Sequence, residues 1–444
     1  MLAGWGRLAV PGHEVLAEDL AAATRDAVLT RGLGRSYGDA SLPPPGVLEV
    51  VGSRRADRIL AFDGQAGVLR AEAGLSLHEL VRLLLPRGWF VPVSPGTQHV
   101  TLGGMVAADV HGKNHHRAGT FGAHVTALRV RLAGGRIVEC SPRRQKALFQ
   151  ATVGGMGLTG HILEVEHRLE RLPSPWIACR TSLHATLEET AEALLASREL
   201  PFTAAWLDGV GGGARSGRGV VLAGRWAARE EAPREPPRQP RPVAVPFPAP
   251  EALLNRLTVG LFNRLYRWRQ GTRPAEAVVS PFAFFYPLDA VGGWNRLYGR
   301  RGMTQYQCVI PQEAGIAGLR RFWDLMRESG GRPYLVVLKD FGAEGTGLLS
   351  FPRPGWTLAL DFPAEPGTRR LVATLNAFLA TVGGRFYLAK DAFSTAAELA
   401  ACEGERLARF QEARRRWDPQ GHLRSRLSVR LLEDDAGPAE EEGA

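Results

Sequence analysis

The sequence predicts a two-domain protein of the α+β class. Three observations carry this prediction. The chain has 444 residues, more than the ~100–200 residues typical of one domain. Its composition, 45% apolar and 23% charged, is that of a soluble globular protein, and no apolar run approaches the ~18–20 residues of a membrane span. Short strand-like segments also alternate with amphipathic helical ones in both halves of the chain.

The residue pattern in the first third of the chain predicts alternating helices and strands. Residues 14–31 show helical spacing, and residues 76–88 predict an amphipathic helix that begins at Ser76, a favourable N-cap. Residues 127–141 predict a hairpin that turns at Gly134 and Gly135. Short strands are expected at 47–51, 59–63 and 67–74.

Two glycine-rich stretches interrupt this pattern. Glycines let the backbone bend sharply and bring N–H groups close to a ligand. In residues 94–124 their density predicts a large bound molecule, and we expect this stretch to wrap a flavin. In residues 31–39 (RGLGRSYGD), Gly32, Gly34 and Gly38 are spaced for an anion-binding loop with Arg35 as the charge partner for phosphate. A plain glycine turn is the alternative for this second stretch.

A third glycine pattern formally matches a dinucleotide-binding fingerprint, at Gly155, Gly157 and Gly160. We reject a Rossmann fold because Ile162, Leu163 and Val165 alternate like a strand instead of opening a helix. A glycine loop that runs into a strand can still hold a pyrophosphate through backbone N–H groups.

The second half of the chain again mixes strands and helices. Strands are expected at 206–210 and 219–226, within 281–384 and at 385–391, and helices at 184–198, 313–329, 367–382 and 394–416. Residues 228–250 are proline-rich and charged, which predicts a mobile surface loop. The acidic end of the chain, 433–444, is expected to be disordered.

Residues 251–269 predict a basic amphipathic helix. Leu253, Leu257, Leu261 and Leu265 line one face, and arginines lie off it. Such a helix packs on its own domain or lies on an anionic membrane. Packing on its own domain is the more ordinary arrangement.

The formal net charge of +10 favours anionic partners: phosphorylated ligands, nucleic acid or an acidic membrane surface. Part of the arginine excess is equally explained by genomic composition. We expect no nucleic acid, because arginines and aromatics are not interleaved and neither a helix-turn-helix nor zinc-ligand spacing occurs. His111, His115 and His116 lack the HExxH spacing, so no metal is expected. The four cysteines are far apart and the N-terminus is too polar for a signal peptide, so a cytoplasmic location is expected.

Four long motifs in order resemble one family. RGLGRSYGD, the stretch from PGT to FGAHV, ATVGGMGLTG and the late YLAKD together resemble the flavin oxidases of the vanillyl-alcohol-oxidase superfamily, with their PCMH-type FAD-binding fold. Within it they are most similar to the decaprenylphosphoryl-ribose 2′-oxidase group. The resemblance covers most of the chain. It implies an FAD domain made of 1–168 and 385–432, with an antiparallel-sheet substrate domain at 169–384.

The resemblance also implies which residues form the site. Tyr37 stands where several members of the superfamily have a histidine that binds flavin covalently, so non-covalent FAD is expected. Lys113, Lys339 and Lys390 are the implied catalytic residues. The implied substrate contacts are Tyr286, Gln305, Gln307 and Thr357. The implied cofactor contacts are Gly32, Gly34, Arg35, Ser36, Tyr37, Pro95, Gly96, Thr97, Thr101, Gly103, Gly104, Asp109, His111, Gly112, Asn114, Gly119, Gly122, Gly157, Thr159 and Ile162.

The expected reaction is oxidation of a secondary sugar hydroxyl, with hydride transfer to flavin N5. The reduced flavin develops negative charge, which a cation such as Lys390 stabilises. The expected substrate is a phosphorylated or lipid-linked sugar, for example a polyprenyl-phosphate pentose. A short-chain reductase partner would complete an epimerisation, and a peripheral contact with the inner membrane face is left open. The alternatives are a soluble alditol or aldonolactone oxidase, a basic nucleic-acid- or membrane-binding protein, and a flavin-free structural relative.

The sequence departs from the mycobacterial members of the group at one strand, GWTLALDFP. They have a cysteine that covalent inhibitors attack, and here Ala359 takes its place, while Thr357 replaces an asparagine. This departure puts the exact substrate in doubt.

Overall fold

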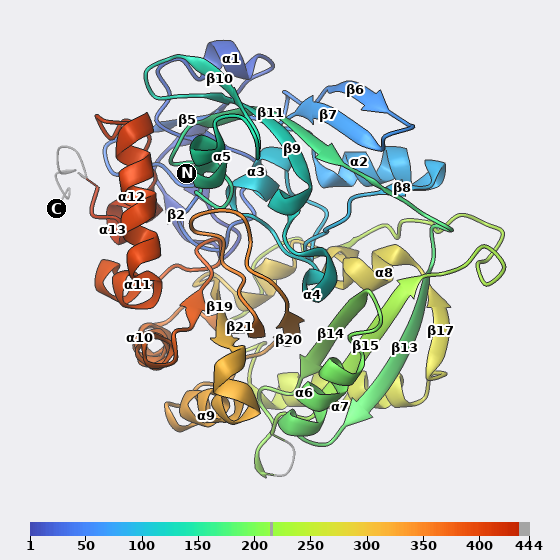
Figure 1. Ribbon diagram of the computed structural model, residues 1–444. Coiled ribbons are helices and arrows are strands. Elements are labelled where there is room, and N and C mark those ends of the chain that lie inside the picture. Colours follow the sequence, from blue (N-terminus) through green and yellow to red (C-terminus); the bar gives the residue numbers. More distant parts are fainter. Residues whose placement is uncertain (214–215, 435–444) are drawn as a thin grey trace.

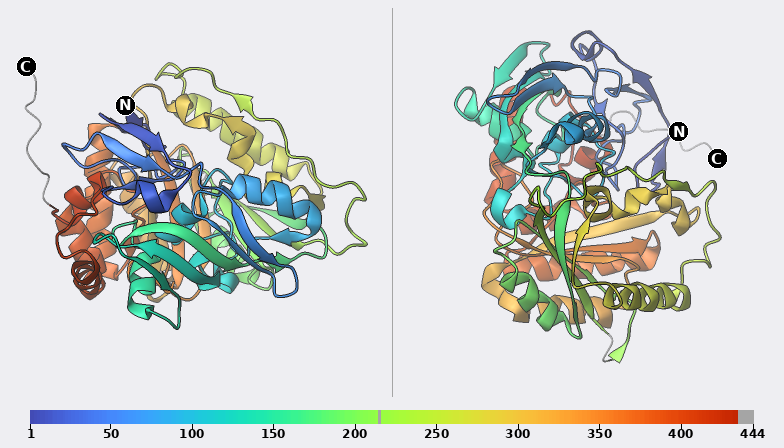
Figure 2. Two further views of the ribbon diagram at one scale, coloured as in Figure 1. Left: turned by 90° about the horizontal axis from the view of Figure 1, so that it is seen from above. Right: turned by 90° about the vertical axis from the view of Figure 1, so that its right-hand side faces the viewer.

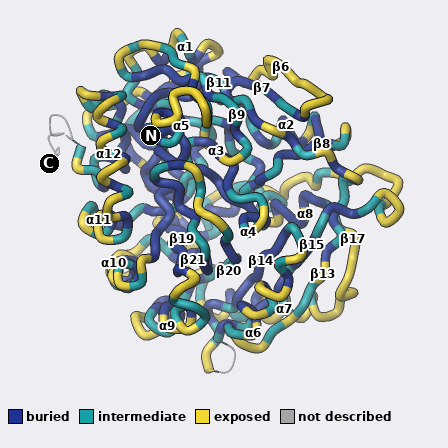
Figure 3. Tube along the Cα trace, viewed as in Figure 1, coloured by how far each residue is buried: buried dark blue, intermediate teal, exposed yellow. Residues whose placement is uncertain are grey.

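The computed structural model describes residues 1–213 and 216–434, and places a five-stranded sheet and an eight-stranded sheet in two stacked parts of the molecule (Figure 1). The blue and cyan N-terminal part and the red C-terminal helices lie on one side. The green to orange central segment forms the other (Figure 1). Buried residues fill both parts and the region between them (Figure 3).

The five-stranded sheet belongs to the N-terminal part. Its strands run in the order β10 (Ile137–Cys140), β9 (Val125–Arg131), β11 (His161–Arg168), β7 (Val68–Glu72) and β6 (Ile59–Asp63). Helix α2 (Leu77–Leu84) begins as predicted, with Ser76 Oγ accepting from Glu79 N at 3.1 Å. The hairpin of β9 and β10 is confirmed, and β11 follows Gly160 directly. The rejection of a Rossmann fold is therefore confirmed.

The predicted helix at 14–31 is wrong. The segment forms strand β3 (His13–Leu16), the short helix α1 (Leu20–Ala23) and strand β4 (Thr30–Arg31). Both strands pair in parallel with β5 (Glu49–Gly52). Pairing with a strand far along the chain outweighs the weak local helix propensity. The result places the glycine loop that begins at Gly32 directly after a strand.

The glycine-rich stretch 94–124 is folded around short helices. Helix α3 (Leu102–Ala107) starts at Thr101, whose Oγ1 accepts from Gly104 N at 3.2 Å. Helix α4 (His115–Ala118) follows within the stretch, and helix α5 (Lys146–Thr152) comes after the β9–β10 hairpin. Leu102, Met105 and Val106 are fully buried in the core of this part, which holds the N-terminus of α3 in place.

The eight-stranded sheet is antiparallel at each of its pairings, in agreement with the predicted fold class. The strand order is β17 (Glu276–Val279), β13 (Ile177–His184), β15 (Gly219–Trp226), β14 (Phe202–Leu207), β20 (Val336–Phe341), β21 (Gly355–Pro363), β19 (Met303–Pro311) and β22 (Arg385–Phe386). Helices α6 (Leu187–Ala196), α9 (Gly315–Glu328) and α10 (Pro366–Val382) cover one face (Figure 1). On the other face, side chains of β14, β19, β20 and β21 line a cavity shared with the N-terminal part.

The segment 228–250 runs over the surface, and most of its residues are exposed. Its strand β16 (Val243–Ala244) pairs in parallel with β18 (Val291–Gly292). Helix α7 (Arg256–Gly271) follows, N-capped by Asn255. Helix α8 (Pro281–Phe285) comes after β17.

The predicted strand at 385–391 is wrong beyond Phe386. Residues 387–390 form a turn, in which Lys390 N donates to Tyr387 O at 2.9 Å. The turn forms because Tyr37 N donates to Ala389 O, and Tyr387 Oη donates to Ala108 O at 2.8 Å. Tertiary contacts with the N-terminal part thus end β22 after two residues.

The C-terminal helices close this part of the molecule. The predicted helix at 394–416 is divided into α11 (Ala396–Glu403) and α12 (Glu405–Trp417) by Gly404, whose φ of 51° ends the first helix. Helix α13 (Arg426–Leu431) carries Arg430. In the predicted tail, Asp434 pairs with both Nη atoms of Arg414 at 2.7 Å, and residues 435–444 lie outside the described residues.

Arg430 joins the glycine loop to the Lys390 turn. Its Nε and Nη2 donate to Asp39 at 2.7 Å each, and its Nη1 donates to Asp391 at 2.8 Å. Both carboxylates are almost fully buried. Arg430→Gln leaves them without their cation, and we expect a loss of about 3–5 kcal/mol in the free energy of unfolding. Urea unfolding of the purified variant measures it.

The matched control is Arg320→Gln, which breaks exposed pairs with Asp324 and Glu188. Exposed pairs contribute about 0–1 kcal/mol, so this variant should unfold at nearly the wild-type urea concentration. Equal losses in the two variants would contradict the role of Arg430.

Candidate active site

A cavity of about 350 Å³ lies between the glycine loops and the open face of the eight-stranded sheet. One wall is backbone-rich: residues 30–41 and 94–113 and the segment around Gly157. The opposite wall is made of side chains from β14, β19, β20 and β21. Residues far apart in the sequence therefore surround one space.

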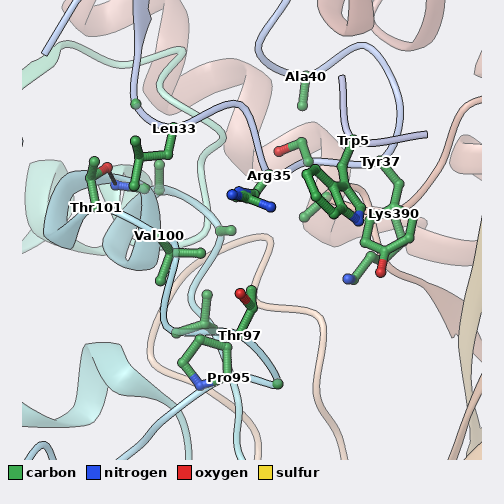
Figure 4. A pocket seen from close by; sticks show the side chains of 18 of the residues that line it. Trp5, Leu33, Arg35, Tyr37, Ala40, Pro95, Thr97, Val100, Thr101 and Lys390 are labelled. Atoms are coloured by element: carbon green, nitrogen blue, oxygen red, sulfur yellow. Dashed lines mark hydrogen bonds between the residues drawn. The ribbon is translucent and has the colours of Figure 1, made fainter. Parts of the chain in front are cut away.

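The loop after β4 brings Arg35 into the middle of this space. Arg35 projects between Thr101 on one side and Trp5 on the other (Figure 4). Its guanidinium stacks on the Trp5 ring at 4.0 Å. The sharp turn before it needs glycine, because Gly34 has φ +61° and a Cβ there would lie 2.1 Å from Arg31 Nη2. Arg31 holds the turn by donating to Ser41 O and Ala3 O.

The second loop is held at the edge of the cavity by Asp289. Thr97 Oγ1 donates to Asp289 Oδ1 at 2.7 Å, and Gln98 N donates to Asp289 Oδ2 at 2.9 Å. Asp289 also lines the cavity. It follows an apolar run with no motif around it, so no sequence signal identified it.

Most of the predicted cofactor residues line the cavity. These are Gly32, Gly34, Arg35, Ser36, Tyr37, Pro95, Gly96, Thr97, Thr101, Gly103, Gly104, His111, Gly112, Gly157 and Ile162. The structure thus brings the three glycine motifs together around one space.

Five of the predicted cofactor residues do not line the cavity. They are Asp109, Asn114, Gly119, Gly122 and Thr159. Asp109 accepts from Gly122 N at 2.9 Å and from Ser350 Oγ. Complete burial raises the pKa of Asp109 to about 6. Asn114 Nδ2 donates to Pro92 O at 2.7 Å. In this structure these side chains position the loops.

The sheet contributes polar groups through strand alternation. Gln305 and Gln307 on β19 both line the cavity, while Tyr306 between them faces the helices. Gln307 Nε2 donates to His111 Nε2 at 2.9 Å and to Thr357 Oγ1 at 3.2 Å. Gln305 Nε2 donates to Asp361 Oδ1 at 2.5 Å.

Two predicted substrate residues lie deeper than expected. Thr357 is fully buried beside Gln307, and the Tyr286 hydroxyl hydrogen bonds with Ser94 Oγ at 2.6 Å. Neither is among the lining residues. Asp361 was missed by the sequence reasoning, although a carboxylate in the apolar run TLALDFP was a signal for a buried polar role.

Lys113, Lys339 and Lys390 all line the cavity. Burial lowers the pKa of Lys339 to about 7, with further lowering by the charges of Lys113 and Lys390. Burial lowers the pKa of Lys390 to about 7, while Asp361 opposes this shift, and Lys390 Nζ lies 3.8 Å above the Tyr37 ring. Burial lowers the pKa of Lys113 to about 8, and its Nζ donates to Phe284 O at 2.7 Å.

The histidines of the glycine stretch are engaged with other groups. His116 Nε2 hydrogen bonds with Leu200 O at 3.0 Å, and His115 Nδ1 accepts from Gly342 N at 3.1 Å. Burial lowers the pKa of His111 well below its usual value, so it is neutral at physiological pH.

Comparison with known proteins places these features in a family. Residues 15–141 match the family described as "FAD binding domain". The chain is 35% identical to decaprenylphosphoryl-β-D-ribose oxidase of Mycolicibacterium smegmatis, over 97% of both chains. An uncharacterised protein of Streptomyces coelicolor is 33% identical over 80% of this chain and 100% of its own. A putative D-arabinono-1,4-lactone oxidase of Neurospora crassa is 27% identical over 33% of this chain and 26% of its own.

The chain belongs to the PCMH-type family of FAD-dependent oxidoreductases. It is therefore an oxidoreductase that uses FAD, as predicted. The cavity fits this cofactor. A Cβ at Gly96 or Gly157 would point into open space, so both positions leave room for a ligand. Among the described residues, the buried Nε of Arg35 has no hydrogen-bond partner, which suits an anionic phosphate of FAD.

Non-covalent binding of FAD is the first prediction for this site. The resemblance implies that Tyr37 takes the place of a linking histidine, so acid precipitation of the purified protein should release the yellow chromophore into the supernatant. The visible spectrum of supernatant and redissolved pellet measures this. A flavin spectrum that stays with the pellet would mean a covalent bond.

Proposed function

We propose that this enzyme oxidises a secondary hydroxyl of a sugar attached to a polyprenyl phosphate, with the 2′-hydroxyl of a pentose as the preferred position. The observation that carries the proposal is the cluster of Lys113, Lys339 and Lys390 in one cavity. Burying three amines in one place is costly unless a bound anion compensates them. A phosphate on the substrate, besides the phosphates of FAD, is such an anion.

The name of the mycobacterial relative supports the same substrate class. The helix α7 region and the basic charge of the chain are compatible with a lipid-linked substrate. A reductase that acts on the resulting ketone would complete an epimerisation, and we propose a short-chain reductase for that step.

The oxidation removes a hydride from the carbon that carries the hydroxyl and a proton from the hydroxyl oxygen. The C–OH group thereby becomes a carbonyl. Bound FAD supplies the hydride acceptor. With pKa values of about 7, Lys339 and Lys390 are partly neutral near physiological pH, so one of them can accept the hydroxyl proton. The protonated partner holds the anionic part of the substrate. Gln305 and Gln307 orient the sugar hydroxyls from neighbouring positions on one strand.

Anaerobic flavin bleaching tests the proposal. A short-chain prenyl-phosphoryl pentose should reduce the flavin within the turnover time, and free pentose should not. The runner-up function, oxidation of a soluble alditol or aldonolactone, is favoured only by the partial likeness to the putative lactone oxidase. Rapid bleaching by free arabinono-lactone, but not by the prenyl phosphate, would establish that second function.

Substrate binding should weaken as the pH rises. Lowered pKa values mean that Lys339 and Lys390 lose their charge as the pH passes about 7, so attraction for the phosphodiester is fully present below this pH and fades above it. A bound anion raises the pKa values of these lysines, so they lose their charge at a higher pH. KM for the prenyl-phosphoryl pentose should therefore rise between pH 7 and 9, as measured by steady-state kinetics.

Lys339→Met should raise KM roughly 10- to 100-fold at pH 7, because one charge-assisted hydrogen bond of about 1.5–3 kcal/mol is lost. The variant should also show a weaker dependence of KM on pH. The matched control is Lys146→Met, a surface lysine at the start of α5. An unchanged pH profile in Lys339→Met would contradict the assigned role.

The alanine at position 359 predicts a difference in inhibition. Ala359 lines the cavity. The resemblance implies a cysteine at this position in the mycobacterial members. Inhibitors that require this thiol should form no covalent adduct with the wild-type protein, and Ala359→Cys should gain one. Intact-protein mass spectrometry after turnover detects the adduct. An adduct on the wild-type protein would show that another group reacts.

A further inference from the structure

Helix α7 turns its apolar side to the solvent. Leu257, Leu261 and Leu265 are 85%, 57% and 55% exposed, and Phe262 and Trp268 are 59% and 67% exposed. The leucines are four residues apart, so they lie along one side of the helix. Contiguous exposed apolar surface of this kind is uncommon on a soluble monomer and marks an interaction site.

The opposite side of α7 attaches the helix to the eight-stranded sheet. Val259 and Asn263 are buried, and Asn263 Nδ2 donates to Asp208 Oδ1 at 2.7 Å. Tyr266 packs on Trp206 with 5.0 Å between ring centroids. Arg267 Nη1 donates to two backbone oxygens of the sheet region. The helix is thus docked by its more polar side, the reverse of an ordinary surface helix.

The expectation that the leucine face packs on its own domain is therefore wrong. The physical reason is the set of specific contacts that Asn263, Tyr266 and Arg267 make on the other side of the helix.

The charges that α7 itself carries have one sign. Residues 252–275 contain five arginines and neither aspartate nor glutamate. Arg256, Arg264 and Arg269 are exposed on the helix. A basic rim around exposed leucines and a tryptophan complements an anionic lipid surface, where arginines meet phosphates and the apolar side chains enter the interface. In the described part of the chain, no helix is long and apolar enough to cross a membrane.

A second exposed apolar group lies nearby in the segment 228–250. Val243 and Phe247 are 74% and 68% exposed. Arg296 fixes this segment by donating to Val245 O and Pro246 O at 2.8 Å. Both views of Figure 2 place the segment and α7 along the same outer edge of the molecule.

Both elements connect to the cavity. Trp294, which lines the cavity, is the first residue of the 3-10 turn Trp294–Tyr298, which also carries Arg296. Leu254, which precedes the N-cap residue of α7, packs against the cluster of Tyr37, Trp294, Tyr298 and Met303. Tyr334 Oη donates to Leu254 O at 2.9 Å, and the next residue, Leu335, lines the cavity.

We propose that α7, together with Val243 and Phe247, docks the enzyme on an anionic membrane surface, so that its lipid-linked substrate passes from the bilayer to the cavity. The delivery role rests on the proposed function, whereas the docking itself does not. The leucines, Phe262 and Trp268 enter the interface, and Arg256, Arg264 and Arg269 contact lipid phosphates.

Vesicle co-sedimentation of the full-length, FAD-loaded protein tests the docking. The probes are vesicles of equal parts phosphatidylglycerol and phosphatidylcholine, and vesicles of phosphatidylcholine alone. We expect binding to the anionic vesicles, and at least a roughly tenfold lower partition coefficient for Leu257→Glu/Leu261→Glu. The matched control, Leu48→Glu/Leu60→Glu, makes the same charge change at exposed leucines of the N-terminal part and should bind like the wild type.

Three results would overturn the docking proposal: absence of binding to anionic vesicles, equal binding by the α7 variant, or equal loss in the control. Light scattering adds a further outcome. A dimeric wild type that becomes monomeric in the α7 variant would show that a second copy covers this face, which also overturns the proposal.

Bleaching assays with a short, water-soluble prenyl-phosphoryl pentose separate the two proposals. The α7 variant should keep the wild-type kcat/KM for this substrate but lose activity on the same sugar carried by a long prenyl chain in vesicles. If the soluble substrate does not bleach the flavin although the protein binds the vesicles, the proposed function is overturned and the docking proposal is retained. Equal vesicle activity in both proteins would overturn the delivery role.

Discussion

The site depends on one buried ion-pair network, in which Arg430 binds Asp39 and Asp391. Asp39 ends the loop that carries Arg35 and Tyr37, and Asp391 follows Lys390. A cation on the last described helix thus holds together two segments that are more than 350 residues apart. The backbones touch there as well: a Cβ at Gly38 would lie 1.8 Å from Asp391 O. Without this contact neither the phosphate side nor the Lys390 side of the cavity would be in place.

The second constraint is the alternation of β-strands. The eight-stranded sheet directs one set of side chains into a helix-covered core and the other into the cavity, and this is why Gln305, Gln307 and Lys339 can be polar within otherwise apolar strands. The amines are kept in a low-dielectric space, where an anion is attracted strongly. The same burial that lowers their pKa values makes them suitable both for binding phosphate and for moving a proton.

Helix α7 shows how polar contacts can decide the orientation of an amphipathic helix. Its arginine and asparagine bonds to the sheet region turn the leucine side outward. Exposing that side in water is unfavourable by the hydrophobic effect, so the arrangement makes physical sense where another apolar phase covers it. The membrane is the phase that the surrounding charge favours.

The amino-acid sequence was enough to predict the fold class, the FAD-dependent chemistry through the resemblance of its four motifs, and the glycine loops, glutamines and lysines that line the cavity. It could do so because glycine spacing, strand alternation and helix caps are local properties, as at Gly34, Gln305 and Ser76. Three features became visible only in the folded chain: residues 14–31 form two short strands around a one-turn helix, Lys390 lies in a turn, and Asp109 and Thr357 do not line the cavity. Those outcomes depend on partners distant in the chain, such as β5, Ala389 and Ser350. The roles of Asp289 and Arg430 could not be predicted for the same reason. A single charged residue shows no periodicity, and its role depends on the groups that folding places beside it.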